Sequence, residues 1–279
     1  MNEFLQQDFE VKSLSRHLLS PSPDVESIKG NIFDADSYKV LLETWQPELV
    51  VQAAWQTESG TYRTDPINAL YSNSTINFAR DCFENGTRKF IGLGSAAEYG
   101  NFKSREKTTS IPFEPSDSYG ASKVRTFQEL MQFADQGEVN ISWARIFQPY
   151  GRNQDSERLI PSIVLFLKSK NNLIINSPFT ELDWISSRDV ARAIHFISTQ
   201  SKSDSYDVGT GILTTTYDLF FLIKELLLPG NPRIEFPGDI RKIPEPNSIN
   251  FNSANNGLTQ LGWSPSDSLD TGLRWSLEI

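Results

Sequence analysis

This sequence of 279 residues contains little cysteine and no long apolar run, and each absence excludes a class of protein. Cys82 is the single cysteine, so the chain forms no disulfide within itself and a reducing compartment is expected. No apolar stretch approaches the ~18 residues that a membrane span requires. The first residues carry acids and glutamines, which do not form a signal peptide. The sequence therefore predicts a soluble, cytoplasmic protein with no membrane partner.

Positive charge and metal-ligand patterns are also scarce. The chain has 26 Lys and Arg against 35 Asp and Glu, a formal net charge of −9. This balance argues against nucleic acid as the main partner, although one or two cations can still hold a diphosphate. His17 and His195 are far apart and lack carboxylate or cysteine companions at ligand spacing. No metal is expected.

Strand and helix patterns alternate along the chain, which is typical of a parallel α/β sheet. Strands are predicted at 9–14, 48–54, 89–93 and 140–147, and long helices at 66–85 and 118–136. The length allows one large core, or one core with a lobe attached.

Tyr119 and Lys123 form the first candidate chemical pair. Residues four apart on a helix share a face, about 6 Å apart at Cβ. A nearby ammonium favours the tyrosinate, so Lys123 is expected to lower the pKa of Tyr119 from its ordinary ~10. The phenol would then be a usable general acid or base. A Tyr-x-x-x-Lys pair also arises by chance, so a solvated helix face is the alternative.

Ser95 adds context, because it directly follows a predicted strand and ligands of α/β sheets bind beyond the carboxyl ends of strands. Residues 90–100 read FIGLGSAAEYG, and a long polar loop then leads to YGASK at 119–123. Here the chain resembles the extended short-chain dehydrogenase/reductases, specifically the NAD-dependent epimerase/dehydratase family of nucleotide-sugar enzymes.

The resemblance covers nearly the whole chain. Further ordered matches are the Ala53-Ala54 pair, Asp65-Pro66 followed by Asn73, 145–151, 182–185 with 189–191, and the closing segment 261–265. The family fold implied is α/β, a Rossmann-like doubly wound parallel sheet with a smaller C-terminal substrate-binding lobe. A dinucleotide-binding domain is expected at 1–152 and 181–212, and the lobe at 153–180 and 213–279.

The resemblance also implies a Ser/Tyr/Lys set that works with NAD or NADP. Tyr119 would exchange a proton with a sugar hydroxyl while hydride passes to or from the nicotinamide. Lys123 would hold the nicotinamide ribose, and Ser95 would hydrogen-bond the reacting oxygen. Other cofactor-binding residues are expected at Asn31, Ile32, Ala53, Ala54 and Asn73, and nucleotide-sugar-binding residues at Gln148, Arg158 and Arg241. A homodimer through the helices at Pro66 and Ser118 is a further family expectation.

The two residues after Ser95 bear on the subclass. Dehydratases of the family carry Asp and then Glu there, whereas this chain has Ala96 and Ala97, which move no proton. Glu98 is one residue too late and is expected to point elsewhere. A 4,6-dehydratase is therefore disfavoured, and an epimerase or a keto-sugar reductase is expected.

One element of the family pattern does not occur in this sequence. Members begin with a strand and a Gly-x-x-Gly-x-x-Gly turn that cradles the pyrophosphate. Here residues 2–7 resemble the end of the following helix, and 9–14 the second strand. The strands at Val11 and Val50 would then either leave a gap of about two strand spacings, ~9–10 Å, or move together.

Three explanations of this difference stay open: a start chosen too far downstream, a shortened product that is unstable or inactive, and a chain that has turned its cleft to binding. Two functions of different classes follow. One is an NAD(P)-dependent nucleotide-sugar epimerase or reductase. The other is a non-catalytic sugar-nucleotide-binding or regulatory protein, favoured also by Leu182, which stands where relatives have an arginine for the diphosphate.

Overall fold

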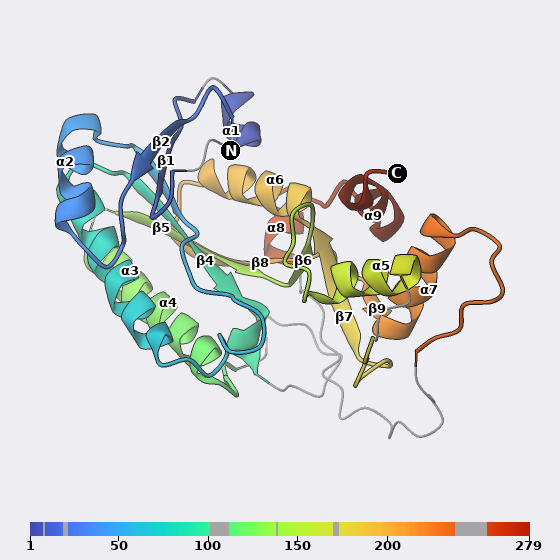
Figure 1. Ribbon diagram of the computed structural model, residues 1–279. Coiled ribbons are helices and arrows are strands. Elements are labelled where there is room, and N and C mark those ends of the chain that lie inside the picture. Colours follow the sequence, from blue (N-terminus) through green and yellow to red (C-terminus); the bar gives the residue numbers. More distant parts are fainter. Residues whose placement is uncertain (8, 19–21, 101–111, 138, 170–172, 238–255) are drawn as a thin grey trace. The chain divides into compact units, whose positions relative to one another are not determined.

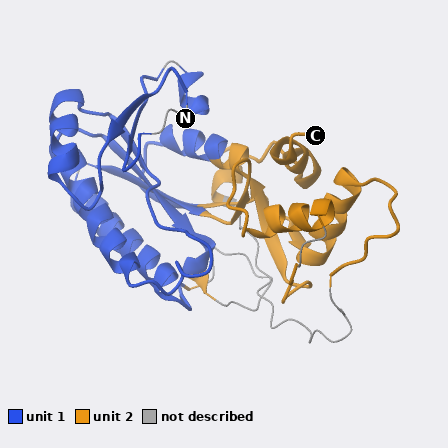
Figure 2. Ribbon diagram, in the orientation of Figure 1, with its two compact units in different colours: residues 1–98, 113–145, 191–206 blue, residues 99–112, 146–190, 207–279 orange. Residues whose placement is uncertain are grey.

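The computed structural model describes residues 1–7, 9–18, 22–100, 112–137, 139–169, 173–237 and 256–279 (Figure 1). The chain divides into two compact units, coloured separately in Figure 2. Unit 1 comprises residues 1–98, 113–145 and 191–206, and unit 2 comprises 99–112, 146–190 and 207–279. The assignment of a cofactor domain and a substrate lobe stays a prediction.

Unit 1 is built on parallel strand pairs. Its elements are α1 (Asn2–Leu5), β1 (Lys12–Ser15), β2 (Glu26–Lys29), α2 (Asp36–Trp45), β3 (Leu49–Gln52), α3 (Ile67–Glu84), β4 (Lys89–Ser95), η1 (Ala96–Tyr99), α4 (Ser118–Gln136) and β5 (Asn140–Ile146). The chain returns through α6 (Ser187–Ser198) and β8 (Asp204–Val208). One sheet has the strand order β3-β4-β5-β8, and β1 pairs with β2 in a separate sheet. β1 runs parallel to β2, and β3 runs parallel to β4.

The core of unit 1 lies where α3 and α4 meet the sheet, and Figure 1 shows these two helices side by side along one flank. Phe90 and Ile141 from the strands pack there with Cys82 from α3, and all three are fully buried. A hydrogen bond of 2.8 Å between the hydroxyls of Thr126 and Ser72 joins the two helices inside this interface. Buried apolar side chains and a satisfied polar pair therefore hold the helices to the sheet.

Two glycines of β4 are explained by Trp143 of β5. A Cβ atom added at Gly92 or Gly94 would overlap the indole ring of Trp143, which lies flat against the strand. At Gly94 the added atom would also overlap the carboxylate of Glu98. The Gly-Leu-Gly sequence thus leaves room for the Trp143 and Glu98 side chains to pack against β4.

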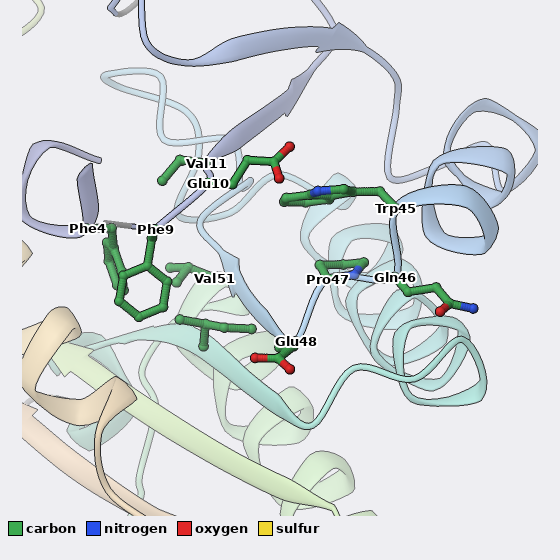
Figure 3. A pocket seen from close by; sticks show the side chains of 10 residues that line it. Phe4, Phe9, Glu10, Val11, Trp45, Gln46, Pro47, Glu48 and Val51 are labelled. Carbon is green, nitrogen blue, oxygen red and sulfur yellow. The ribbon is translucent and has the colours of Figure 1, made fainter. Parts of the chain in front are cut away.

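A pocket of about 410 Å³ lies between the β1 segment and β3. Figure 3 shows Phe4, Phe9 and Val11 on one side and Val51 on the other. The remaining lining residues are Glu10, Trp45, Gln46, Pro47, Glu48 and Leu49. Among the residues described, β1 pairs with β2 and β3 with β4, so the two strands have not moved together. Within the described ranges, β1 and β3 are thus not neighbours in one sheet, and the width of the predicted gap stays a prediction.

The sheet of unit 2, with the strand order β6-β7-β9, contains both parallel and antiparallel pairs. Its elements are β6 (Gln148–Tyr150), α5 (Leu159–Ser169), β7 (Glu181–Ser186), β9 (Leu213–Thr215), α7 (Thr216–Leu227), α8 (Asn256–Gln260) and α9 (Leu269–Leu277). β7 pairs in parallel with β6 and antiparallel with β9. Fully buried Ile163, Phe220 and Leu273 bring α5, α7 and α9 into one core.

The predicted α/β architecture is confirmed, and the predicted helix at 118–136 has the bounds of α4. The short strands β6 and β9 are differences from the strand prediction, because three residues are too few to show a period of two. Within the described ranges, no helix is both long and apolar enough to cross a membrane.

Candidate active site

The carboxyl end of β4 and the first turn of α4 bring the predicted catalytic residues together. Ser95 is the last residue of β4. Asp117 caps α4 by accepting a hydrogen bond from the Gly120 amide at 2.8 Å. The helix therefore begins at Ser118 and places Tyr119 and Lys123 one turn apart on the same face.

Gly120 allows α4 to approach the chain that follows β4. A Cβ atom at this position would overlap the carbonyl oxygen of Ala97 in η1. Only glycine leaves room for a backbone contact this close. The start of α4 is thereby held beside Ser95, although some twenty residues of chain separate the two elements.

The Ser95 hydroxyl lies close enough to Tyr119 to influence its phenol. Burial raises the pKa of Tyr119, and the nearby Ser95 hydroxyl opposes the rise. The expectation that Lys123 lowers the pKa of Tyr119 is therefore wrong for this structure, because the loss of solvent around the phenol dominates. At neutral pH Tyr119 is a protonated phenol, which is a proton donor.

Lys123 is held behind Tyr119 and is 3% exposed. Its Nζ donates a hydrogen bond to the Leu93 carbonyl at 2.6 Å and lies 5.7 Å from the centre of the Tyr119 ring. Burial lowers the pKa of Lys123 to about 7, and the charge of Glu98 opposes this fall. The ammonium therefore titrates close to physiological pH.

Trp55 covers Lys123, a contact that the sequence analysis did not predict. The Lys123 Nζ lies 3.7 Å from the centre of the Trp55 indole, within the range of a cation–π interaction. The ring stacks on Tyr71 at 5.4 Å, and its Nε1 donates to Asn68 at 2.8 Å. The Lys123 ammonium is thus engaged by the Trp55 ring on one side and by the Leu93 carbonyl through a hydrogen bond.

The predicted cofactor-binding residues lie in three places in unit 1. Ala53 and Ala54 are exposed just beyond β3, where their small side chains leave room for a ligand. Asn31 lies in the turn after β2 and accepts a hydrogen bond from the Phe33 amide, while Ile32 is half-buried against the core. Asn73 is exposed on α3.

These residues suit the nicotinamide end of a dinucleotide. The hydroxyls of Ser95 and Tyr119, the Lys123 ammonium and the small side chains of Ala53 and Ala54 offer hydrogen-bonding groups and room for a nicotinamide riboside.

The predicted substrate-binding residues belong to unit 2. Gln148 is exposed in β6, and Arg158 lies just before α5, where its carbonyl accepts a hydrogen bond from Ser162. Arg241 lies outside the described residues. The side chain of Leu182 packs against the apolar core of unit 2, which suits its lack of a polar group.

The sequence also did not predict the buried ion pair between Glu98 and Arg145, which lies beside Ser95. Glu98 accepts a hydrogen bond from Arg145 Nε at 2.6 Å, and both side chains are buried. The acidic residue within FIGLGSAAEYG was the available signal, but the sequence does not show that it turns inward.

A family model gives the decisive comparison. The model of the NAD dependent epimerase/dehydratase family matches residues 1–209, which include β1 to β8 and every residue of the candidate site in unit 1. The chain belongs to this family. It is a family whose members act on nucleotide sugars, as the names of its relatives indicate.

Curated relatives are distant but extended matches. The dTDP-D-glucose 4,6-dehydratase of Mus musculus is 21% identical over 266 residues, covering 93% of this chain and 75% of that protein. The GDP-mannose 3,5-epimerase 1 of Oryza sativa subsp. indica is 23% identical over 223 residues, covering 74% of this chain and 57% of that protein. The matches thus include both dehydratases and epimerases.

Solved structures share the fold. The UDP-glucose 4-epimerase of Thermotoga maritima, solved with UDP-glucose, has a TM-score of 0.84 at 20% identity, covering 99% of this chain and 92% of that one. The Bordetella bronchiseptica enzyme WbmG, solved with NAD and UDP, has a TM-score of 0.78 at 19% identity, covering 99% and 88%. These similarities show that this chain has a Rossmann-like fold.

Proposed function

We propose that this protein is an NAD(P)-dependent nucleotide-sugar epimerase or keto-sugar reductase in which Ser95, Tyr119 and Lys123 act together. The observation that carries the proposal is the placement of Ser95 at the end of β4 beside the first turn of α4, where the Lys123 ammonium lies 5.7 Å from the centre of the Tyr119 ring. Three groups suited to proton transfer are thereby gathered at the carboxyl end of a parallel strand, where α/β sheets bind ligands.

Tyr119 is the proton-transfer group in this scheme. As a buried phenol close to Ser95, it would donate its proton to a sugar carbonyl oxygen, and the tyrosinate would accept one from a sugar hydroxyl in the reverse direction. Ser95 would hydrogen-bond the same sugar oxygen, and the nearby Lys123 ammonium would stabilise the tyrosinate. A bound dinucleotide would supply hydride transfer. Lys123, Ala53 and Ala54 would hold its nicotinamide end, and Asn31, Ile32 and Asn73 would complete the cofactor site.

Two alanines set the subclass in this proposal. Ala96 and Ala97 occupy the start of η1, where an acid and base that eliminate water from a sugar would be needed. A methyl side chain moves no proton, so the proposal is an epimerase or reductase although the relatives of this chain include 4,6-dehydratases. Unit 1 would hold the cofactor. Gln148, Arg158 and Arg241 of unit 2 would bind the nucleotide sugar, a substrate class that UDP-glucose represents in a related structure.

The test begins with a titration of the 279-residue chain with NAD(H) and NADP(H), followed by thermal stability. At about 100 times its dissociation constant, a ligand that binds only the folded state adds ~2.7 kcal/mol. Turnover is then measured with UDP-, dTDP- and GDP-sugars. Tyr119→Phe should retain cofactor binding and lose about 100- to 10,000-fold in turnover. Undiminished turnover in Tyr119→Phe would refute the assignment of roles.

A second function is supported by Trp55. Because the indole and the Leu93 carbonyl already engage the Lys123 ammonium, the present arrangement suits a protein that binds a sugar nucleotide without a dinucleotide. This alternative expects that UDP-glucose raises the melting temperature while NAD(H) and NADP(H) leave it unchanged. The same titration therefore separates the two functions.

We also infer a homodimer through α3 and α4. Leu70 on α3 is a large apolar side chain that is 47% exposed, and a matching copy would cover it. Sedimentation equilibrium should give a dimer mass that Leu70→Glu converts to that of a monomer. A monomeric parent protein would exclude this assembly.

A further inference from the structure

The Glu98 carboxylate lies directly behind Ser95. It is 0% exposed, and its Oε1 accepts a hydrogen bond of 2.8 Å from the backbone N–H of Ser95. The side chain comes from η1, three residues after Ser95, so it turns back on the end of β4. A Cβ atom at position 94 would overlap this oxygen, which means that the glycine there is required for the carboxylate to fit.

Two side chains of β5 complete the environment of Glu98. Trp143 Nε1 donates to both carboxylate oxygens, at 3.0 and 3.2 Å, and Arg145 Nε donates to Oε2 at 2.6 Å. The Arg145 guanidinium lies 4.4 Å from the ring centres of both Phe113 and Phe127. Burial raises the pKa of Glu98, and the arginine charge and these donors oppose the rise. Since each of these groups donates, the site is built for an ionised carboxylate.

The same carboxylate acts on Lys123. The Lys123 Nζ lies 5.9 Å from the centre of the Trp143 ring whose Nε1 binds Glu98. Glu98 provides the charge that raises the pKa of Lys123 against the effect of burial. The other charged or titratable groups around Tyr119 and Lys123 are Arg145 of β5, Tyr62 and Arg63 before α3, and Asp117, which is paired with Arg63 at 2.7 Å.

We propose that Glu98 is a positioning residue for the Ser95, Tyr119 and Lys123 set. Its carboxylate fixes the backbone of Ser95 at the end of β4, and its negative charge favours the ammonium form of Lys123. The catalytic part of this inference rests on the proposed function, but the charge assignment does not. An ion pair that served stability alone would need only Arg145, whereas this carboxylate also binds the backbone of Ser95.

The decisive variant is Glu98→Gln, which keeps the shape and an acceptor oxygen but removes the charge. The readout is the pKa of Lys123, followed by NMR in protein labelled with ¹³C at lysine Cε, the resonance being assigned from its loss in Lys123→Met. Starting from a pKa of about 7, we expect a fall of at least ~0.5 in Glu98→Gln, because the opposite charge is gone. The matched control is Glu58→Gln, which removes an exposed carboxylate of the same unit and should leave this pKa unchanged.

If Glu98→Gln does not fold, the double variant Glu98→Gln with Arg145→Met removes both buried charges and avoids an unpaired arginine. A Lys123 pKa that stays the same in a folded variant would overturn the proposal. The titration needs neither cofactor nor substrate, so it reports on Glu98 even if the proposed function fails. If the parent protein turns over nucleotide sugars, the alkaline limb of the pH profile of kcat, along which Lys123 loses its proton, should move to lower pH in Glu98→Gln, whereas a purely structural loss would lower kcat equally at all pH values.

Discussion

The surroundings of β4 and of β3 differ in how they are packed, although both strands belong to the same sheet. Behind β4, Trp143 and the Glu98–Arg145 pair fill the space completely, down to the glycines that admit them. Beside β3, a pocket of about 410 Å³ separates the strand from β1. Side chains therefore pack closely against β4, whereas the space beside β3 remains a pocket.

A register pair shows what the difference means for a single residue. Val51 of β3 lies opposite Ile91 of β4, so the two are neighbours in one parallel ladder. Ile91 is 0% exposed, whereas Val51 is 37% exposed at the edge of its sheet. Strand neighbours on both sides, more than apolar character, decide how deeply a residue of this sheet is buried. The following changes test that contrast, from the largest expected effect to the smallest.

Arg145→Met should destabilise the protein most. It leaves the Glu98 carboxylate buried without its cation, which costs about 3–5 kcal/mol in comparable pairs. The free energy of unfolding is measured with urea by far-UV circular dichroism. The double variant with Glu98→Gln should recover most of this loss, because the unpaired charge is gone. A loss of less than about 1 kcal/mol in Arg145→Met would mean that water reaches the carboxylate.

Lys123 should make stability depend on pH. The folded ammonium loses its proton near pH 7 and the unfolded one near ~10.4, so the unfolded chain binds more protons in between. The free energy of unfolding should therefore rise with pH above 7, by up to about 1.4 kcal/mol per unit, while the full cost of burying the ammonium persists below pH 7.

The measurement compares the parent protein with Lys123→Met at pH 7, 8 and 9. Burial also lowers the pKa of Lys89, to about 8, but that contribution is common to both proteins. The difference between them therefore isolates Lys123. Parallel stability profiles would show that Lys123 keeps an ordinary pKa.

Gly94→Ala should cost about 1–3 kcal/mol, because the added methyl overlaps Trp143 and Glu98 in a filled core. Gly86→Ala is not a suitable comparison, since its φ of +93° adds backbone strain. Gly137→Ala is the matched control, because an added Cβ there meets neighbours only at van der Waals distance. Equal urea midpoints for the two variants would contradict the packing described for β4.

Val51→Ala should have the smallest effect, below about 1 kcal/mol, because the side chain is already partly in water beside the pocket. Its register partner provides the control: Ile91→Ala removes fully buried atoms and should cost about 2–5 kcal/mol. Similar losses in the two variants, measured by urea unfolding, would show that the region beside β3 is closed in solution.

The same contrast explains which parts of the molecule the sequence predicts. Periodicity and caps are local, so the bounds of α4 and the position of Ser95 at the end of β4 follow from short stretches of chain. The direction in which the Tyr119 pKa shifts cannot be predicted from a short stretch of chain, because it depends on how completely neighbouring elements exclude water. The contact of Trp55 with Lys123 joins residues far apart in sequence, and no local pattern indicates it.

The ion pair between Glu98 of η1 and Arg145 of β5 could not be predicted from the sequence for the same reason. Glu98 and Arg145 are 47 residues apart, and their spacing carries no period that identifies a pair. Their roles in the chemistry, and those of Asn31, Ile32 and Asn73, stay predictions until the variants are measured.

Cys82 of α3 is fully buried in the core of unit 1, so its rate of reaction with a thiol reagent can report on the opening of this core. Thiol reagents attack the thiolate, and burial raises the pKa of Cys82 to about 12, so the closed protein offers neither access nor ionisation at neutral pH. As the chain has no second cysteine to react first, each labelling event records one excursion in which α3 lifts from the strands. The rate of labelling by a thiol reagent thus reports how often this interface opens, and no cysteine has to be introduced.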